Sequence, residues 1–217
     1  KQWDEEQEKK TKAYFSHCEE IRESLRKRFE KILQIQNIGP CIPAQGRYFF
    51  QRKPEGKNHP ILYYRDGING KEKLALDPNT FSSDGTVALS RYFISPKGNF
   101  IAFCKTERGS DRMPIQVFDL KKNAVLEDYI SPIRYSLITW LQDESGFYYT
   151  KWPEKGFDND EDSYQVYFHK LGTLRKEDKA LFGKDSSGSK FTEIYLSPDD
   201  RYLFISLCDC SSRNDLY

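Results

Sequence analysis

The sequence lacks the features of a membrane protein and of a protein that binds polyanions. It has no apolar run of about 18 residues, the length that a helix needs to span a bilayer. We expect no secretory signal, because Lys1–Lys10 is charged almost throughout. The 34 basic and 33 acidic side chains leave a net charge of +1, so neither nucleic acid nor an anionic membrane is an expected partner.

Cysteine is scarce and irregularly spaced. The count is odd, at five, which does not fit a disulfide framework, and the residues are Cys18, Cys41, Cys104, Cys208 and Cys210. A reducing cytoplasmic location is therefore the expectation. Two thiols alone do not make a structural zinc site, and no EF-hand glycine or terminal glutamate accompanies the acidic run at 158–162. We expect no metal and no cofactor.

The catalytic groups of a serine hydrolase are also missing. The nucleophile of an α/β-hydrolase usually lies in a Gly-x-Ser-x-Gly turn, and this sequence contains none. A catalytic triad needs a histidine beside both a nucleophile and a carboxylate. The sequence places no such pair near its three histidines, for which structural or exposed roles are expected: His17, His59 and His169. We predict no catalytic residue in this chain, which by itself should hydrolyse nothing.

What the sequence does have is many aromatic side chains. Aromatic residues make up 15%, including 14 Tyr and 15 Phe, while apolar residues reach only 37%. Rings with one dry face and one wet end suit strands that are buried on one side. The composition therefore favours a mainly β protein over a helical bundle.

The N-terminal segment is predicted to be helical. Apolar residues recur there at steps of three and four, the period of a one-sided helix, at Cys18, Ile21, Leu25, Phe29, Ile32 and Leu33. Ser16 and Glu19 have the spacing of a capping box. A shorter helix around Trp3–Tyr14 is expected before it, and Asn37–Pro40 ends the pattern. The apolar stripe requires a partner surface.

From Gly46 onward, aromatic-rich strands recur after small turns. The equivalent positions are 46, 98, 146 and 200, which lie 52, 48 and 54 residues apart. Self-similarity at about 50 residues, with four strands per unit, is typical of a propeller blade. An antiparallel sandwich with similar hairpins is the alternative. The prediction is a partial β-propeller of about three and a half four-stranded blades, preceded by one or two helices.

Several stretches resemble the prolyl oligopeptidase family in order and with little insertion. They are Leu76–Ser90, Ser95–Gly98, Gly109–Asp111, Ile138–Trp140, Asp143–Tyr149, Trp152-Pro153, and His169–Thr173 with Glu177-Asp178. The resemblance implies a serine endopeptidase that cleaves short peptides after proline, with a seven-bladed-type propeller covering an α/β-hydrolase domain. It also implies that residues 1–45 dock on that hydrolase domain of the same polypeptide, and that residues 46–217 form the first blades.

The same resemblance suggests an apolar subsite for the residues before the proline. Alignment through Ser136 and Trp140 places Tyr135 in it, and alignment through Leu196–Pro198 places Phe191 there. Cys210 falls near a third lining position, and packing between blades is the alternative role for all three. Apolar and ring contacts suit a proline-containing peptide, which has few hydrogen-bond donors.

Two functions remain open at this point. The chain is expected to be the gating portion of a longer prolyl oligopeptidase, because the strand pattern stops at Tyr217 partway through a repeat. The alternative is a stand-alone propeller-like interaction module. Such a module would cover its open strand edges by self-association.

Overall fold

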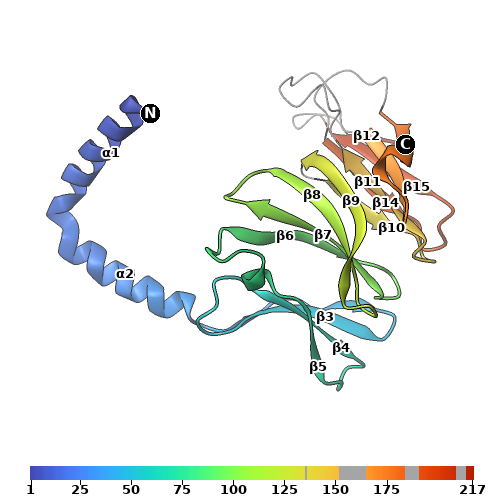
Figure 1. The fold of residues 1–217 in the computed structure, drawn as a ribbon, viewed down its shortest axis with the longest axis horizontal. Coiled ribbons are helices and arrows are strands. Elements are labelled where there is room, and N and C mark those ends of the chain that lie inside the picture. Colours follow the sequence, from blue (N-terminus) through green and yellow to red (C-terminus); the bar gives the residue numbers. More distant parts are fainter. Residues whose placement is uncertain (135, 152–164, 184–190, 209–213) are drawn as a thin grey trace.

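The computed structural model describes residues 1–134, 136–151, 165–183, 191–208 and 214–217. Figure 1 shows two helices followed by a series of sheets in chain order. The helices are α1 (Gln2–Phe15) and α2 (Glu19–Leu33), joined by a single 3₁₀ turn at Ser16–Cys18. The helix predicted from the apolar spacing and the shorter helix expected before it are both confirmed.

Four antiparallel sheets follow the helices. The first holds β1 (Asn37–Ile38), β2 (Ile42–Ala44), β3 (Arg47–Lys53), β4 (Ile61–Asp66) and β5 (Glu72–Leu76). The second holds β6 (Val87–Ile94), β7 (Phe100–Glu107), β8 (Arg112–Asp119) and β9 (Ala124–Arg134). The third holds β10 (Ile138–Trp140), β11 (Gly146–Lys151), β12 (Gln165–Lys170) and β13 (Lys179–Phe182). The fourth holds β14 (Phe191–Leu196), β15 (Leu203–Cys208) and β16 (Asn214–Leu216).

In the second, third and fourth sheets, and from β2 onward in the first, strands that are consecutive in sequence pair with one another, as in the blades of a propeller. The predicted mainly β fold, a partial propeller that follows N-terminal helices in the chain, is confirmed. The first sheet begins earlier than the strand pattern indicated. Asn37 pairs with Lys53 and Ile42 pairs with Phe49, so β1 and β2 together form one interrupted edge strand beside β3.

The core lies between neighbouring sheets. Alternate residues of a strand point to opposite faces, so each central strand supplies two packing layers. In β7, Ile101 and Phe103 pack toward the first sheet, while Ala102 and Cys104 join the layer that contains Trp140 and its neighbours in the third sheet. A smaller cluster joins the third and fourth sheets around Val166, Ile194, Ile205 and Leu207.

The turns before β7, β11 and β15 correct one predicted equivalence. In each, a residue in the left-handed region donates its backbone N–H three residues back: Gly98 to Ser95, Glu144 to Leu141, and Asp200 to Ser197. The structural counterpart of Gly98 is therefore Glu144, and the predicted counterpart Gly146 is wrong by two residues. Gly146 already belongs to β11, where an added Cβ would lie 2.3 Å from the backbone oxygen of His169.

Two of these left-handed residues, Glu144 and Asp200, also join one sheet to the next. The Glu144 carboxylate accepts hydrogen bonds from the Ser95 hydroxyl, the Lys97 backbone N–H and the Asn99 side chain, all in the preceding turn. Asp200 repeats the contact one sheet later by accepting from the Gln142 backbone N–H at 2.7 Å. The turns before β11 and β15 are thus each held to the turn before them by a carboxylate.

The predicted capping box is wrong. The Ser16 hydroxyl donates to the backbone oxygen of Ala13 at 2.7 Å, so it satisfies the end of α1 and does not cap α2. Helix α2 begins at Glu19 after Cys18, which makes no side-chain cap. The chain passes directly from α1 through the 3₁₀ turn into α2, so α2 begins without an N-cap side chain.

The apolar stripe of α2 is uncovered in this structure. Figure 1 shows both helices projecting away from the sheets. Neither helix has a buried residue, and Phe29 is 56% exposed. The stripe therefore remains available for a partner surface.

Candidate functional site

The first strands of the four sheets line one apolar hollow. It has a volume of about 370 Å³ and takes Ile42 from β2, Phe93 from β6, Trp140 from β10 and Leu196 from β14. The indole N–H of Trp140 donates to the backbone oxygen of Phe93 at 3.1 Å, which ties β10 to β6. The hollow is thus where strands far apart in sequence meet.

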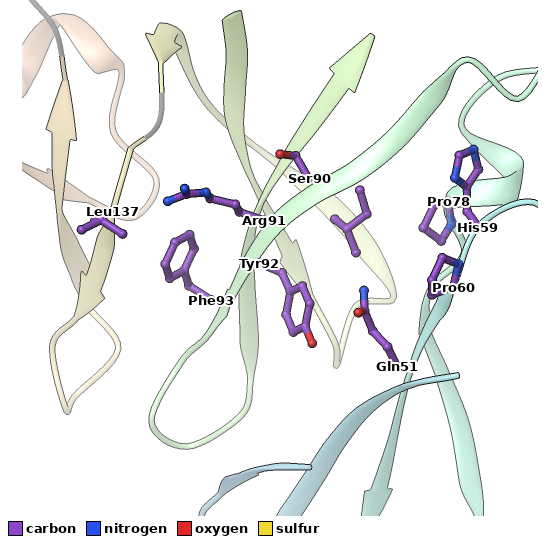
Figure 2. A pocket seen from close by; sticks show the side chains of 10 residues that line it. Gln51, His59, Pro60, Pro78, Ser90, Arg91, Tyr92, Phe93 and Leu137 are labelled. Atoms are coloured by element: carbon purple, nitrogen blue, oxygen red, sulfur yellow. The ribbon is translucent and has the colours of Figure 1, made fainter. Parts of the chain in front are cut away.

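A second cavity lies beside the middle of β6 and has a volume of about 430 Å³ (Figure 2). Its walls are mostly apolar, with a few polar groups, and they comprise Gln51, His59, Pro60, Pro78, Leu89, Ser90, Arg91, Tyr92, Phe93 and Leu137. Cavities of about 300–1,000 Å³ with this mixture are typical of small-molecule and peptide sites. We name it the β6 cavity.

One wall of the β6 cavity is built by the turn at Asp77–Thr80. Asn79 accepts a hydrogen bond from the His59 backbone N–H and donates its side-chain amide to the His59 carbonyl, both at 3.0 Å. Asp77 in turn accepts from the Asn79 backbone N–H at 2.9 Å. The Asp-Pro-Asn stretch that carried the family resemblance therefore holds His59 and Pro78 at the cavity.

The predicted subsite residues fall mainly outside the described part of the chain. Tyr135 and Cys210 lie outside the described residues. Phe191 begins β14, where its backbone pairs with Cys208, and its side chain is not among those described. Leu137, two residues after Tyr135, lines the β6 cavity. The subsite prediction remains a prediction.

A buried ionic cluster joins the second and third sheets. His169, at 0% exposure, places its Nε2 at 3.0 Å from Asp128 and its Nδ1 at 2.8 Å from Asp178. Asp128 also accepts from the Gly172 backbone N–H, and Asp178 accepts from the Tyr149 hydroxyl at 2.9 Å. We name these side chains, His169, Asp128, Asp178 and Tyr149, the His169 cluster.

Electrostatics make His169 a cation. Burial alone would lower its pKa, but hydrogen bonds and charge attraction from Asp128 and Asp178 outweigh burial and raise the pKa to about 9. The pKa of Asp128 is lowered, because the bonds from His169 and Gly172 overcome its own burial. Both ring nitrogens are engaged by carboxylates, so His169 cannot act as a catalytic base.

The sequence did not reveal the partners of His169. They come from β9 and from the turn before β13, which tertiary packing brings to one place. One signal was present, since Asp178 closes the stretch that begins at His169 in the family resemblance. The other two histidines are separate: His17 is exposed beside Ser16, and His59 contacts the Gly85 carbonyl at 2.9 Å.

Neither a metal site nor a membrane span is found in the part of the chain that the structure covers. Within those residues, no three or more histidine, cysteine, aspartate or glutamate side chains are arranged to hold a metal ion. No described helix combines the length and the apolar character that crossing a bilayer requires.

Comparison with known proteins identifies the family. The model of the prolyl oligopeptidase N-terminal β-propeller domain matches residues 1–217. The prolyl endopeptidase of Elizabethkingia meningoseptica is 31% identical over the whole chain, and that of Dictyostelium discoideum is 26% identical. The chain covers 31% and 35% of these two relatives, about a third of their length.

Solved structures similar to this chain also come from prolyl endopeptidases and prolyl oligopeptidases. A structure from a study of two prolyl endopeptidases matches 93% of this chain, with a TM-score of 0.85 and 30% identity. Prolyl oligopeptidase B of Galerina marginata, solved with a 35-residue hydrolysis and macrocyclization substrate, has a TM-score of 0.77 at 20% identity, which supports the fold alone. The chain belongs to the prolyl oligopeptidase family, in which it corresponds to the N-terminal β-propeller domain.

Proposed function

We propose that this chain is the gating and substrate-filtering portion of a serine endopeptidase that cleaves short peptides after proline. The observation that carries the proposal is the match to prolyl endopeptidases along all of residues 1–217. The chain's own sequence holds no Gly-x-Ser-x-Gly motif, so its contribution is binding and access and not bond cleavage.

The cavities support a role in binding peptides. The apolar hollow is lined by the first strands of the sheets, and the β6 cavity is lined by β6 together with β3 and neighbouring loops; the walls of both are largely apolar. A proline-containing segment lacks an N–H at each proline, so apolar and ring contacts are the physical means of holding it. Tyr135, Phe191 and Cys210 are proposed to extend this lining as a subsite for the residues before the proline.

The experiment compares the full-length protein with residues 1–217 on two blocked fluorogenic dipeptides. The dipeptides differ only in having proline or alanine before the reporter. We expect the full-length protein to cleave the proline compound at least about 100-fold faster, and residues 1–217 to cleave neither above buffer. Equal cleavage of both compounds, or activity of residues 1–217 alone, would contradict the proposal.

The same preparation separates the two candidate functions. A natural product no heavier than 25.5 kDa, with no peptidase activity, would favour the stand-alone interaction module. A longer product would support filtering if it cleaves peptides of about ten residues but does not cleave a folded protein that contains the same ten-residue sequence. Size selection follows when a narrow path separates solvent from the nucleophile.

Residues 1–45 are proposed to dock on the hydrolase domain of the same polypeptide through the α2 stripe. Ile21, Phe29 and Leu33 are each more than half exposed, and an isolated helix of 15 residues is marginal in water. Burying such side chains stabilises a contact by about 1.5–3 kcal/mol each when burial is complete.

Hydrogen exchange tests this docking. We expect the amides of α2 to exchange at least about tenfold more slowly in the full-length protein than in residues 1–217. Phe29→Ala should remove much of that protection, whereas Lys27→Ala, which leaves the stripe intact, should not. Equal exchange in both lengths of chain would show that α2 has no docking partner.

A cytoplasmic location is part of the proposal. Cys18 and Cys41 are exposed free thiols. Such thiols suit a reducing compartment. Fractionation of the source cells checks this, and recovery in an extracellular fraction would contradict it.

A further inference from the structure

Arg91 differs from the other half-buried arginines of the sheets. Within the part of the chain that the structure describes, every other one has an acceptor: Arg47 with Asp66, Arg52 and Arg65 with Glu72, Arg134 with Asp111, and Arg175 with the Ser131 carbonyl. Among those same residues, no hydrogen bond or ion pair of Arg91 is found. A half-buried guanidinium has lost part of its hydration, so an acceptor is expected to replace it.

The position of Arg91 is set by a bulge in β6. The register between β6 and β7 shifts between Leu89 and Arg91, and Arg91 then pairs with Cys104. Figure 2 shows the Arg91 and Phe93 side chains on the side of β6 that faces Leu137, while Tyr92 points toward Gln51. The bulge thus turns a cation toward the third sheet at the rim of the β6 cavity.

The electrostatics of the cavity favour an anion. None of its ten lining residues is acidic, and Arg91 is its fixed positive charge. The charge of Arg91 also acts on Cys104, which lies opposite it in the pairing of β6 with β7. Burial raises the pKa of the Cys104 thiol to about 12, and the charge of Arg91 opposes this rise. Phe93 and Leu137, which line the cavity together with Arg91, are apolar, and a less polar environment strengthens charge attraction.

We propose that Arg91 binds a carboxylate of the peptide substrate and so makes the β6 cavity selective for peptides that carry an acidic residue. This rests on the proposed function. Arginine matches a carboxylate with two parallel N–H···O bonds, which gives both attraction and orientation. Leu137 adjoins the segment of the predicted subsite residue Tyr135, so the carboxylate would belong to a residue before the proline.

The experiment uses the full-length protein and a series of peptides that differ at one position before the proline, carrying Glu, Gln or Lys. Both kcat/KM and the Kd from fluorescence anisotropy of labelled peptides are measured. At low salt we expect the best Glu peptide to exceed its Gln counterpart by about five- to tenfold, with Lys weakest. The preference should shrink as salt rises.

Variants of the protein decide the assignment. Arg91→Gln should bring the Glu-to-Gln ratio close to one, and Arg91→Lys should keep part of it. Lys121→Gln removes the same charge from an exposed position in the turn before β9 and should leave the ratio unchanged. An unchanged ratio in Arg91→Gln, or no Glu preference at any position, overturns the proposal.

Failure of the two proposals would look different. Cleavage of the Gln peptide after proline reports the proposed peptidase function and does not depend on Arg91. If no peptide is cleaved, the peptidase function fails, while the anisotropy ratio still decides whether Arg91 selects a carboxylate. Circular dichroism of Arg91→Gln confirms that a lost preference does not reflect a lost fold.

Discussion

Replacing His169 with alanine is expected to destabilise the packing of the second and third sheets by about 3–5 kcal/mol. His169 is fully buried, and its charge is shared between Asp128 and Asp178, whose side chains are 4% and 2% exposed. Removing the cation leaves two buried carboxylates facing each other across a cavity. Uncompensated buried charges and lost packing both oppose folding of this variant.

The measurement is urea denaturation of the full-length protein, with hydrogen exchange of β9 and β12 to locate the loss. His17→Ala, at an exposed position in the turn between the helices, should change stability by no more than about 0.5 kcal/mol. The double variant His169→Gln with Asp128→Asn should be less damaged than His169→Ala, because one of the two charges is removed. A change below about 0.5 kcal/mol for His169→Ala would refute the ionic role.

Raising the pH from about 6.5 to above 9 is expected to remove about 3 kcal/mol of stability from the same sheets. The pKa of His169 is about 9 in the folded protein, against about 6.5 for an unperturbed histidine. Because the folded pKa is raised, this stabilisation is fully present below 6.5 and is lost as pH rises through 9.

The groups that face His169 do not cancel this dependence. Burial, and then the charge of Asp178, raise the pKa of Tyr149, so its hydroxyl stays neutral over this range. Asp128 has a lowered pKa and affects stability at acidic pH. The stabilisation that it contributes is present above a pH near 4, the pKa of an aspartate in the unfolded chain, and is lost as the pH falls below that. Stability should therefore fall at both extremes of pH.

Urea midpoints between pH 6 and pH 10 measure the alkaline decrease. The His169→Gln variant should be less stable at pH 6 and much flatter through pH 9, because it has no proton to lose. An equal alkaline decrease in both proteins would assign the effect to other groups, and the His169 cluster would then have no part in it.

Local patterns in the sequence were sufficient for the elements. Apolar residues that recur every three or four positions predicted α2. Aromatic-rich segments after short turns predicted β3, β7, β11 and β15. The errors concern hydrogen bonds that the pattern does not encode. Ser16 has the spacing of an N-cap, yet its hydroxyl satisfies the helix that ends there. The prediction aligned Gly146 with Gly98 because both are glycines, yet the residue that adopts the left-handed conformation in this turn is Glu144.

The sequence by itself determined the fold class, the repeat and the family, because each depends on residues close together in the chain. Only the tertiary structure decided which side chains meet across sheets. His169 and Asp128 are 41 residues apart, and Ser95 and Glu144 are 49 apart. Strand periodicity records which face of a strand is buried, but it does not record what lies opposite. The bulge that turns Arg91 toward Leu137 belongs to the same class, because it depends on the pairing of β6 with β7.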